Sequence, residues 1–113
     1  MDMELIQRPF GIYEKAIKPQ EWEKMFADAS SAGYQNYEIS LDESDARLAR
    51  LHWDDKQYEE VRRAARNQNI RILSACFSGH RRFPLGSSSR ELEERGIRMM
   101  REGIDFCQNL GVR

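Results

Sequence analysis

The chain has 113 residues, 40% of them apolar and 33% charged, which is enough for one ordinary domain with a very polar surface. Its 18 basic residues nearly balance its 19 acidic ones, and a net charge of −1 argues against a nucleic-acid partner, which would require a clear basic excess. Any anion that this protein binds is therefore expected to sit in a local pocket.

The start of the chain, MDME, is acidic and lacks the basic and apolar regions of a signal peptide. No apolar run approaches the roughly 20 residues that a membrane-spanning helix needs. We therefore expect a cytoplasmic protein with no membrane partner. Cys76 and Cys107 lack the CxxC spacing and lie in apolar surroundings, so buried, reduced thiols are expected.

The first predicted strand is the short apolar run at 9–13, which Glu14 and Lys15 follow at its carboxyl end. Pro19 suits the first turn of a helix, where a missing N–H costs nothing. Gly33 lies where a left-handed cap would end that helix. The side that faces the core is expected to carry four residues at helical spacing: Trp22, Met25, Phe26 and Ala29.

The second predicted strand, 37–41, alternates apolar and polar residues and leads into an acidic, turn-rich loop at 42–45. A short helical turn is expected around Leu48, Leu51 and Trp53. A longer helix is predicted from about residue 54 to 67, with three residues facing inward: Tyr58, Val61 and Ala65.

The third predicted strand, 70–77, is the most apolar short run in the chain, and a cationic loop follows it. Ser88 and Glu91 have the spacing of a capping box at the start of the last helix, 89–110. Val112 and Arg113 read as the first residues of a fourth strand. The apolar stripe of the last helix is predicted to comprise Leu92, Ile97, Met100, Ile104 and Cys107.

Three strand–helix units with a repeat of roughly 30 residues predict an α/β fold with parallel strands. We expect residues 1–113 to form the amino-terminal part of a single TIM (β/α)8 barrel domain, in the order βαβαβα with the start of a fourth strand. The fold expected is therefore the first three units of such a barrel, truncated. The alternative is a complete small three-layer domain.

Loops at the carboxyl ends of parallel strands converge on one face, where ligands bind. This face is expected to hold carboxylates beside a basic cluster. The polar residues are Tyr13, Glu14 and Lys15 in the first loop, Glu38, Ser40, Asp42 and Glu43 in the second, and Ser78, His80, Arg81 and Arg82 in the third.

The third loop carries two adjacent arginines, whose planar donor groups match phosphate or carboxylate geometry. We expect one of Arg81 and Arg82 to point toward the site and the other toward solvent or a salt bridge. Pro84 restricts Phe83 and stiffens the loop, which suits anion capture. The alternative is a solvated basic loop.

His80 could move protons or bind a substrate hydroxyl, or it could simply hydrogen-bond the backbone. Glu14 and Glu38 could contact substrate or pair with Lys15 and Arg82. For Glu38, which lies within a strand, a structural ion pair is expected because an unpaired buried charge is very costly. No Cys/His cluster has zinc spacing, and no glycine-rich phosphate fingerprint is present.

Three stretches, FGIYEKAI, YEISLDESDARLARLHW and ACFSGHRRFPLGS, together resemble the amino-terminal part of the L-ribulose-5-phosphate 3-epimerases. These are bacterial enzymes of the L-ascorbate utilisation type, sometimes named hexulose-6-phosphate isomerases, with a xylose-isomerase-like TIM barrel. The resemblance runs from about residue 9 to the end of the chain.

The resemblance implies a phosphorylated ketose substrate, a homo-oligomer and proton transfer at carbon 3, with a divalent metal ion as cofactor. In that family the metal ligands and the acid/base carboxylates come from later strands, so none is expected within 1–113 and the chain alone is expected to be inactive. The residues carried over as substrate contacts are Glu14, His80 and Arg81, with Arg82 as second choice.

Two other functions remain open from the sequence. One keeps the barrel and changes the chemistry, as in an isomerase of an unphosphorylated sugar or an abasic-site endonuclease. The other is a small non-enzymatic interaction module, in which the open edges of the parallel sheet associate.

Overall fold

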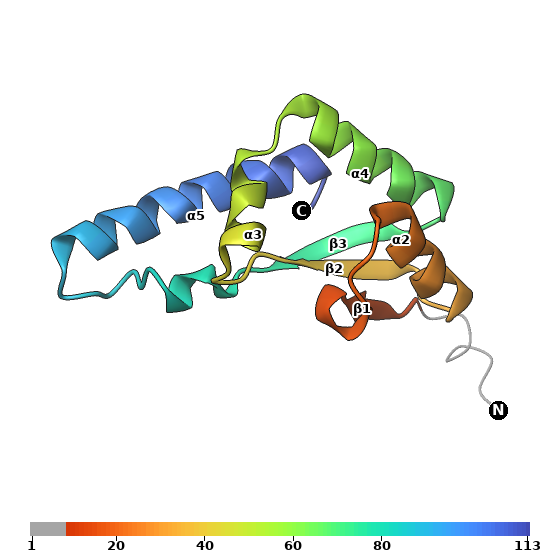
Figure 1. Ribbon diagram of the computed structural model, residues 1–113, viewed down its shortest axis with the longest axis horizontal. Helices are drawn as coiled ribbons and strands as arrows, with labels where there is room; N and C mark the ends of the chain where they lie inside the picture. Colours follow the sequence, from red (N-terminus) through yellow and green to blue (C-terminus); the bar gives the residue numbers. More distant parts are fainter. Residues whose placement is uncertain (1–8) are drawn as a thin grey trace.

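The computed structural model describes residues 9–113, which contain a three-stranded parallel sheet in the order β1-β2-β3 (Figure 1). The strands are β1 (Gly11–Tyr13), β2 (Asn36–Ser40) and β3 (Arg71–Cys76), each close to its predicted bounds. Because each strand is joined to the next through a helix, all three run in the same direction and their carboxyl ends share one edge of the sheet.

Helical segments alternate with the strands, as the sequence predicts. Their bounds are η1 Glu14–Ala16, α2 Trp22–Ser31, α3 Asp45–Leu48, η2 Ala49–His52, α4 Asp55–Asn67, η3 Ser78–Arg81 and α5 Arg90–Leu110.

The ends of the helices follow from local side chains. Asp54 caps α4 through a reciprocal capping box with Gln57. Ser89, one residue later than the predicted Ser88, caps α5 by accepting a hydrogen bond from the amide of Leu92. Gly111 ends α5 in the left-handed region with φ 77°, where a residue with a Cβ would be strained.

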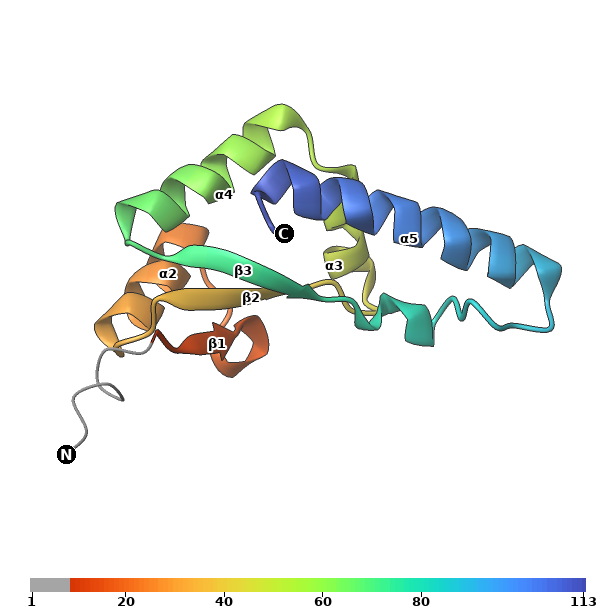
Figure 2. The same ribbon diagram turned by 180° about the vertical axis from the view of Figure 1, so that it is seen from behind.

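The helices bury one face of the sheet. Tyr37, Ile39 and Ile72 of the strands are at most 7% exposed. They belong to one apolar cluster with residues of α2, α4 and α5, notably Phe26, Val61, Ala64 and Phe106. Figure 2 shows α4 and α5 beside β3, with β1 at the opposite edge of the sheet.

The other face of the sheet is polar and uncovered by helices of the described part of the chain. Tyr13, Glu38 and Ser74 line a hollow of about 310 Å³ there. Glu38 stands opposite Ser74, whereas its neighbour Tyr37 stands opposite Ile72, so Leu73 is an extra residue in β3. This bulge keeps the polar Ser74 beside Glu38.

Helix α5 forms where predicted, but only Cys107 of the five residues in the predicted apolar stripe packs against the core. Leu92, Ile97, Met100 and Ile104 are between 37% and 60% exposed. The buried stripe instead comprises Gly96, Met99, Gly103, Phe106 and Leu110. Two of these positions are glycines, which let α5 approach its neighbours closely but add nothing to an apolar pattern.

The described residues span 54 × 34 × 24 Å, and the first half of α5 extends beyond the sheet (Figure 1). Cys76 and Cys107 are both unpaired and half-buried. Burial raises the pKa of the Cys107 thiol. Within residues 9–113, no helix combines the length and the apolar character needed to cross a bilayer.

Candidate functional site

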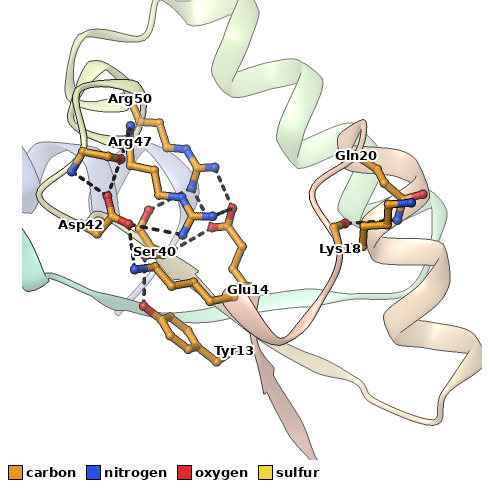
Figure 3. A network of polar contacts seen from close by, with 10 residues as sticks. Tyr13, Glu14, Lys18, Gln20, Ser40, Asp42, Arg47 and Arg50 are labelled. Carbon is orange, nitrogen blue, oxygen red and sulfur yellow. Dashed lines mark hydrogen bonds and ion pairs between the residues drawn. The ribbon is translucent and has the colours of Figure 1, made fainter.

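A polar network joins the loops at the carboxyl ends of β1 and β2 (Figure 3). Glu14 follows β1 directly and is only 2% exposed. Its two carboxylate oxygens accept hydrogen bonds from the two terminal nitrogens of Arg50, at 2.7 and 2.6 Å. The amide of Ser40 donates to the same carboxylate at 2.9 Å, so Glu14 ties the end of β1 to the end of β2.

Arg50 lies in η2, ten residues beyond β2, and folds back over the strand ends. Its Nη1 also donates to the carbonyl of Ser40 at 2.9 Å. The guanidinium lies 4.8 Å from the ring centre of Trp22 and 5.9 Å from that of Trp53. These aromatic faces stabilise the cation and keep water away from its bonds with Glu14.

Asp42 is the second carboxylate of the network. Lys15 binds it at 2.7 Å, and both the amide and the hydroxyl of Ser44 donate to it. Burial opposes ionisation of Asp42, but the hydrogen bonds from Lys15 and Ser44 outweigh it and hold the pKa well below its usual range. The same hydrogen bond raises the pKa of Lys15.

Arg47 lies between the two carboxylates, 3.8 Å from an oxygen of Glu14 and 3.8 Å from an oxygen of Asp42. The network therefore sets three cations, Lys15, Arg47 and Arg50, against two carboxylates. A local excess of positive charge at the strand ends favours an anionic ligand.

Tyr13 connects this network to the uncovered face of the sheet, where its hydroxyl donates to Ser40 Oγ at 3.0 Å. The hydroxyl of Tyr37 is buried on the other face, with no hydrogen-bond partner among residues 9–113. Burial, followed by the nearby charge of Glu14, raises the pKa of Tyr37.

The third loop begins in η3 and contacts the second loop. The amide of Gly79 donates to the carbonyl of Leu41 at 2.9 Å. Arg82 binds Asp45 at 2.5 Å, and its guanidinium lies 5.2 Å from the ring centre of Phe83. Arg81 is exposed, as is Arg82, and no hydrogen bond or ion pair of the Arg81 side chain occurs within residues 9–113.

His80 occupies the inner side of this loop. Its Nδ1 lies 3.3 Å from the carbonyl of Phe83, and its ring packs edge-on against Phe77 with ring centres 4.9 Å apart. Its Nε2 is buried and has no hydrogen-bond partner in the described part of the chain.

The structure corrects the predicted ion pairs. Glu14 pairs with Arg50 rather than Lys15, and Arg82 pairs with Asp45 rather than with Glu14 or Glu38. Glu38 accepts a hydrogen bond from Ser74 at 2.7 Å, and no ion pair to it occurs within residues 9–113. A neighbouring hydroxyl on the open face thus takes the place of the predicted cation.

The four predicted substrate contacts fall into two groups. Glu14 contacts the second loop through Ser40, and Arg82 contacts it through Asp45. The contacts of His80 are with its own loop, and Arg81 is exposed. The second loop therefore connects the two groups. Sequence reasoning missed Arg47 and Arg50, although two cations three residues apart after an acidic loop were a signal that they share one face of a helical turn.

A divalent metal does not fit the residues present. Among the described residues, no three His, Cys, Asp or Glu side chains converge on one point. The carboxylates of Glu14 and Asp42 are already neutralised by Arg50 and Lys15, which would compete with a metal for the same oxygens.

The parallel sheet, with its helices on one face and its polar groups at the carboxyl ends, defines a segment of an α/β barrel. Residues 26–113 match the family described as xylose isomerase-like TIM barrel, and the chain belongs to this family. The predicted fold class, a partial TIM barrel, is confirmed.

Among similar proteins with a stated activity are sugar-phosphate epimerases. The chain is 43% identical over 108 residues to L-ribulose-5-phosphate 3-epimerase UlaE of Salmonella typhimurium, a match that covers 95% of the chain and 38% of that protein. The same protein of Salmonella paratyphi B matches equally well. The resemblance to these epimerases is therefore confirmed, and the chain spans about 38% of their length.

A solved structure has the same fold. The crystal structure of D-psicose 3-epimerase in the presence of D-fructose matches with a TM-score of 0.67 and 15% sequence identity. The match covers 91% of this chain and 34% of that one. At this identity the similarity concerns the fold alone.

Proposed function

We propose that this chain is the substrate-side segment of a sugar-phosphate 3-epimerase that interconverts L-ribulose 5-phosphate and L-xylulose 5-phosphate. The observation that carries the proposal is the 43% identity, along 95% of the chain, to proteins named as L-ribulose-5-phosphate 3-epimerases. The polar network at the strand ends supports it, because three cations face only two carboxylates there.

The third loop is the proposed site for the phosphate group. Arg81 is exposed at the end of η3 and has a planar donor group suited to phosphate oxygens. Arg82, already bound to Asp45, has the secondary role of holding the loop against α3. His80 lies beside Arg81 and is proposed to bind a substrate hydroxyl through Nε2, which requires the loop to open because this atom is buried.

Glu14 supports the site from the first loop. Both of its oxygens are engaged by Arg50, so its proposed role is to keep Arg50 and the end of β2 in place. Direct contact between Glu14 and a ligand stays a prediction.

Epimerisation at carbon 3 needs one group that removes the proton from that carbon and another that returns a proton to the opposite face. We place both groups, and any metal ion, beyond these 113 residues. The part proposed for this chain is to bind and orient the phosphorylated ketose.

A chimera tests the proposal. Residues 9–113 replace the corresponding segment of Salmonella typhimurium UlaE, and proton NMR in D2O follows deuterium exchange at carbon 3 of L-ribulose 5-phosphate. We expect exchange from the chimera and none from the 113-residue chain alone. A folded chimera without exchange would contradict the proposal.

Arg81→Ala in the same chimera tests the phosphate site. We expect KM for L-ribulose 5-phosphate to rise roughly tenfold to hundredfold, the scale of one lost charge-assisted contact, with little change in kcat. The matched control is Arg63→Ala, an exposed arginine on α4. Equal loss for L-ribulose and its phosphate would favour a barrel enzyme for unphosphorylated sugars.

A further inference from the structure

The carboxyl-end loop that carries Arg81 is held between two parts of the chain. On one side, Arg82 binds Asp45, and the amide of Gly79 donates to the carbonyl of Leu41. On the other side the loop meets α5 at Gly96. Beside Gly96, the guanidinium of Arg95 on α5 also lies 4.7 Å from the ring centre of Phe83. At Gly96 itself the contact depends on shape.

Gly96 is buried in the interior of a 21-residue helix, where glycine is the poorest ordinary choice for helix formation. A Cβ at this position would lie 2.6 Å from the carbonyl oxygen of Phe83 and 3.4 Å from that of Pro84. Atoms of this kind do not approach so closely, so either the loop or the helix would have to move. Because both contacts are with backbone atoms, no side-chain rotation can relieve them.

The backbone at Phe83 also determines the pose of the preceding residues. The carbonyl of Phe83 lies 3.3 Å from Nδ1 of His80. The guanidinium groups of Arg82 and Arg95 lie 5.2 and 4.7 Å from the centre of the Phe83 ring. Arg81 is exposed, and no hydrogen bond or ion pair of its side chain occurs within the described residues. The backbone on either side of Arg81 therefore sets the position and direction from which its side chain extends.

We propose that Gly96 is a positioning residue for the phosphate site: its missing side chain seats the Phe83–Pro84 backbone on α5 and thereby fixes the direction of Arg81 and the pose of His80. This inference rests on the proposed function for its ligand, a phosphorylated sugar. It adds to the determinants of affinity a residue of α5 that touches the loop but not the ligand.

The test is Gly96→Ala in the 113-residue chain, followed by amide NMR with inorganic phosphate as the probe. We expect the amide resonances of residues 80–84 to shift before any phosphate is added. We also expect the dissociation constant of phosphate to rise roughly tenfold, because a displaced loop misdirects Arg81. The better helix propensity of alanine offsets the cost of moving the loop, so the urea midpoint is expected to change little.

Gly86→Ala is the matched control. Gly86 lies in the same connection, has nothing within 4 Å of an added Cβ, and is expected to leave both the amides of 80–84 and the phosphate affinity unchanged. Pro84→Ala, at an exposed position, loosens the loop without any clash and gives a second variant should Gly96→Ala fail to fold. We expect it to shift the same amides and to weaken phosphate binding.

The outcomes separate this inference from the proposed function. Unchanged loop amides and unchanged phosphate affinity in Gly96→Ala would overturn the positioning role, whatever the wild-type chain binds. If the wild-type chain binds no phosphate but Gly96→Ala still shifts the loop amides, the contact between the loop and α5 is supported and the proposed ligand is contradicted.

Discussion

Arg50 and Glu14 form the most buried ion pair among the described residues, with side chains 13% and 3% exposed. A buried pair adds little compared with an apolar pair of the same shape, but removal of one partner leaves a charge without compensation. The pair therefore acts as a constraint: the loop after β1 and the turn after β2 must keep the relative position that satisfies both charges.

Glu14→Gln tests this constraint. We expect a loss of about 3 kcal/mol in the free energy of unfolding, measured by urea denaturation, because Arg50 stays buried without its counter-charge. Arg90→Ala breaks the exposed pair with Glu94 and serves as the control, with no measurable change expected. Equal midpoints for Glu14→Gln and wild type would mean that the pair does not hold the two loops.

Asp42 predicts an acid-sensitive contribution to stability. Its folded pKa lies below the ordinary value near 4, so the unfolded chain takes up a proton first as the pH falls. The contribution is therefore complete above about pH 5 and is lost progressively as the pH falls below about 4. In urea titrations between pH 6 and 2.5, Asp42→Asn is expected to flatten this acid limb, and an acid limb identical to that of wild type would contradict the prediction.

At the scale of elements, periodicity predicted the strands and helices well because their apolar residues recur at the right spacing. The buried face of α5 was predicted wrongly for a physical reason. A Cβ added at Gly96 would lie 2.6 Å from the carbonyl oxygen of Phe83, and one added at Gly103 would lie 3.0 Å from the ring of Phe77. The close packing at both positions therefore requires glycine. A pattern that counts large apolar residues selects an adjacent face instead.

Two substitutions distinguish the faces of α5. Phe106→Ala, at a fully buried position, is expected to lower the free energy of unfolding by about 3–5 kcal/mol because it leaves a cavity in the core. Ile104→Gln, at a position 60% exposed, is expected to change it by less than about 0.5 kcal/mol. A similar loss of free energy of unfolding for both variants would support the apolar face that the sequence predicted.

The candidate site was only partly predictable from the sequence. The strand ends identified Glu14, His80 and the arginine loop, since parallel topology alone brings those loops together. The partner of Glu14 could not be found in the same way. Arg50 reaches it through a turn that folds back over the strand ends and is packed by Trp22 and Trp53, and such a return depends on tertiary packing.

At the scale of the whole molecule, the described residues leave an apolar groove of about 620 Å³ between the end of β3 and α5. Phe77, Met100, Ile104 and Val112 are among its lining residues. The outer edge of β3 has no strand partner in this part of the chain. An unprotected parallel edge beside an apolar groove is prone to association, and the predicted homo-oligomer stays a prediction.

Leu73→Lys tests association through this edge. Leu73 is 43% exposed in β3, and a lysine there should oppose edge-to-edge pairing through its charge. In sedimentation velocity over a range of concentrations, we expect wild type to shift toward larger species and Leu73→Lys to shift less. If both proteins show the same concentration dependence of sedimentation and the same urea midpoint, any self-association occurs through another surface.

The extra residue in β3 also bears on which changes of length the strand can accept. Loss of Leu73 would let Ile72 and Ser74 follow each other opposite Tyr37 and Glu38, so every later side chain would keep its side of the sheet. Loss of Ser74 instead would bring an aliphatic side chain against the Glu38 carboxylate. Two deletions one position apart thus have opposite effects. Deletion of Leu73 makes the pairing of β2 with β3 regular, whereas deletion of Ser74 removes the hydroxyl that donates a hydrogen bond to Glu38.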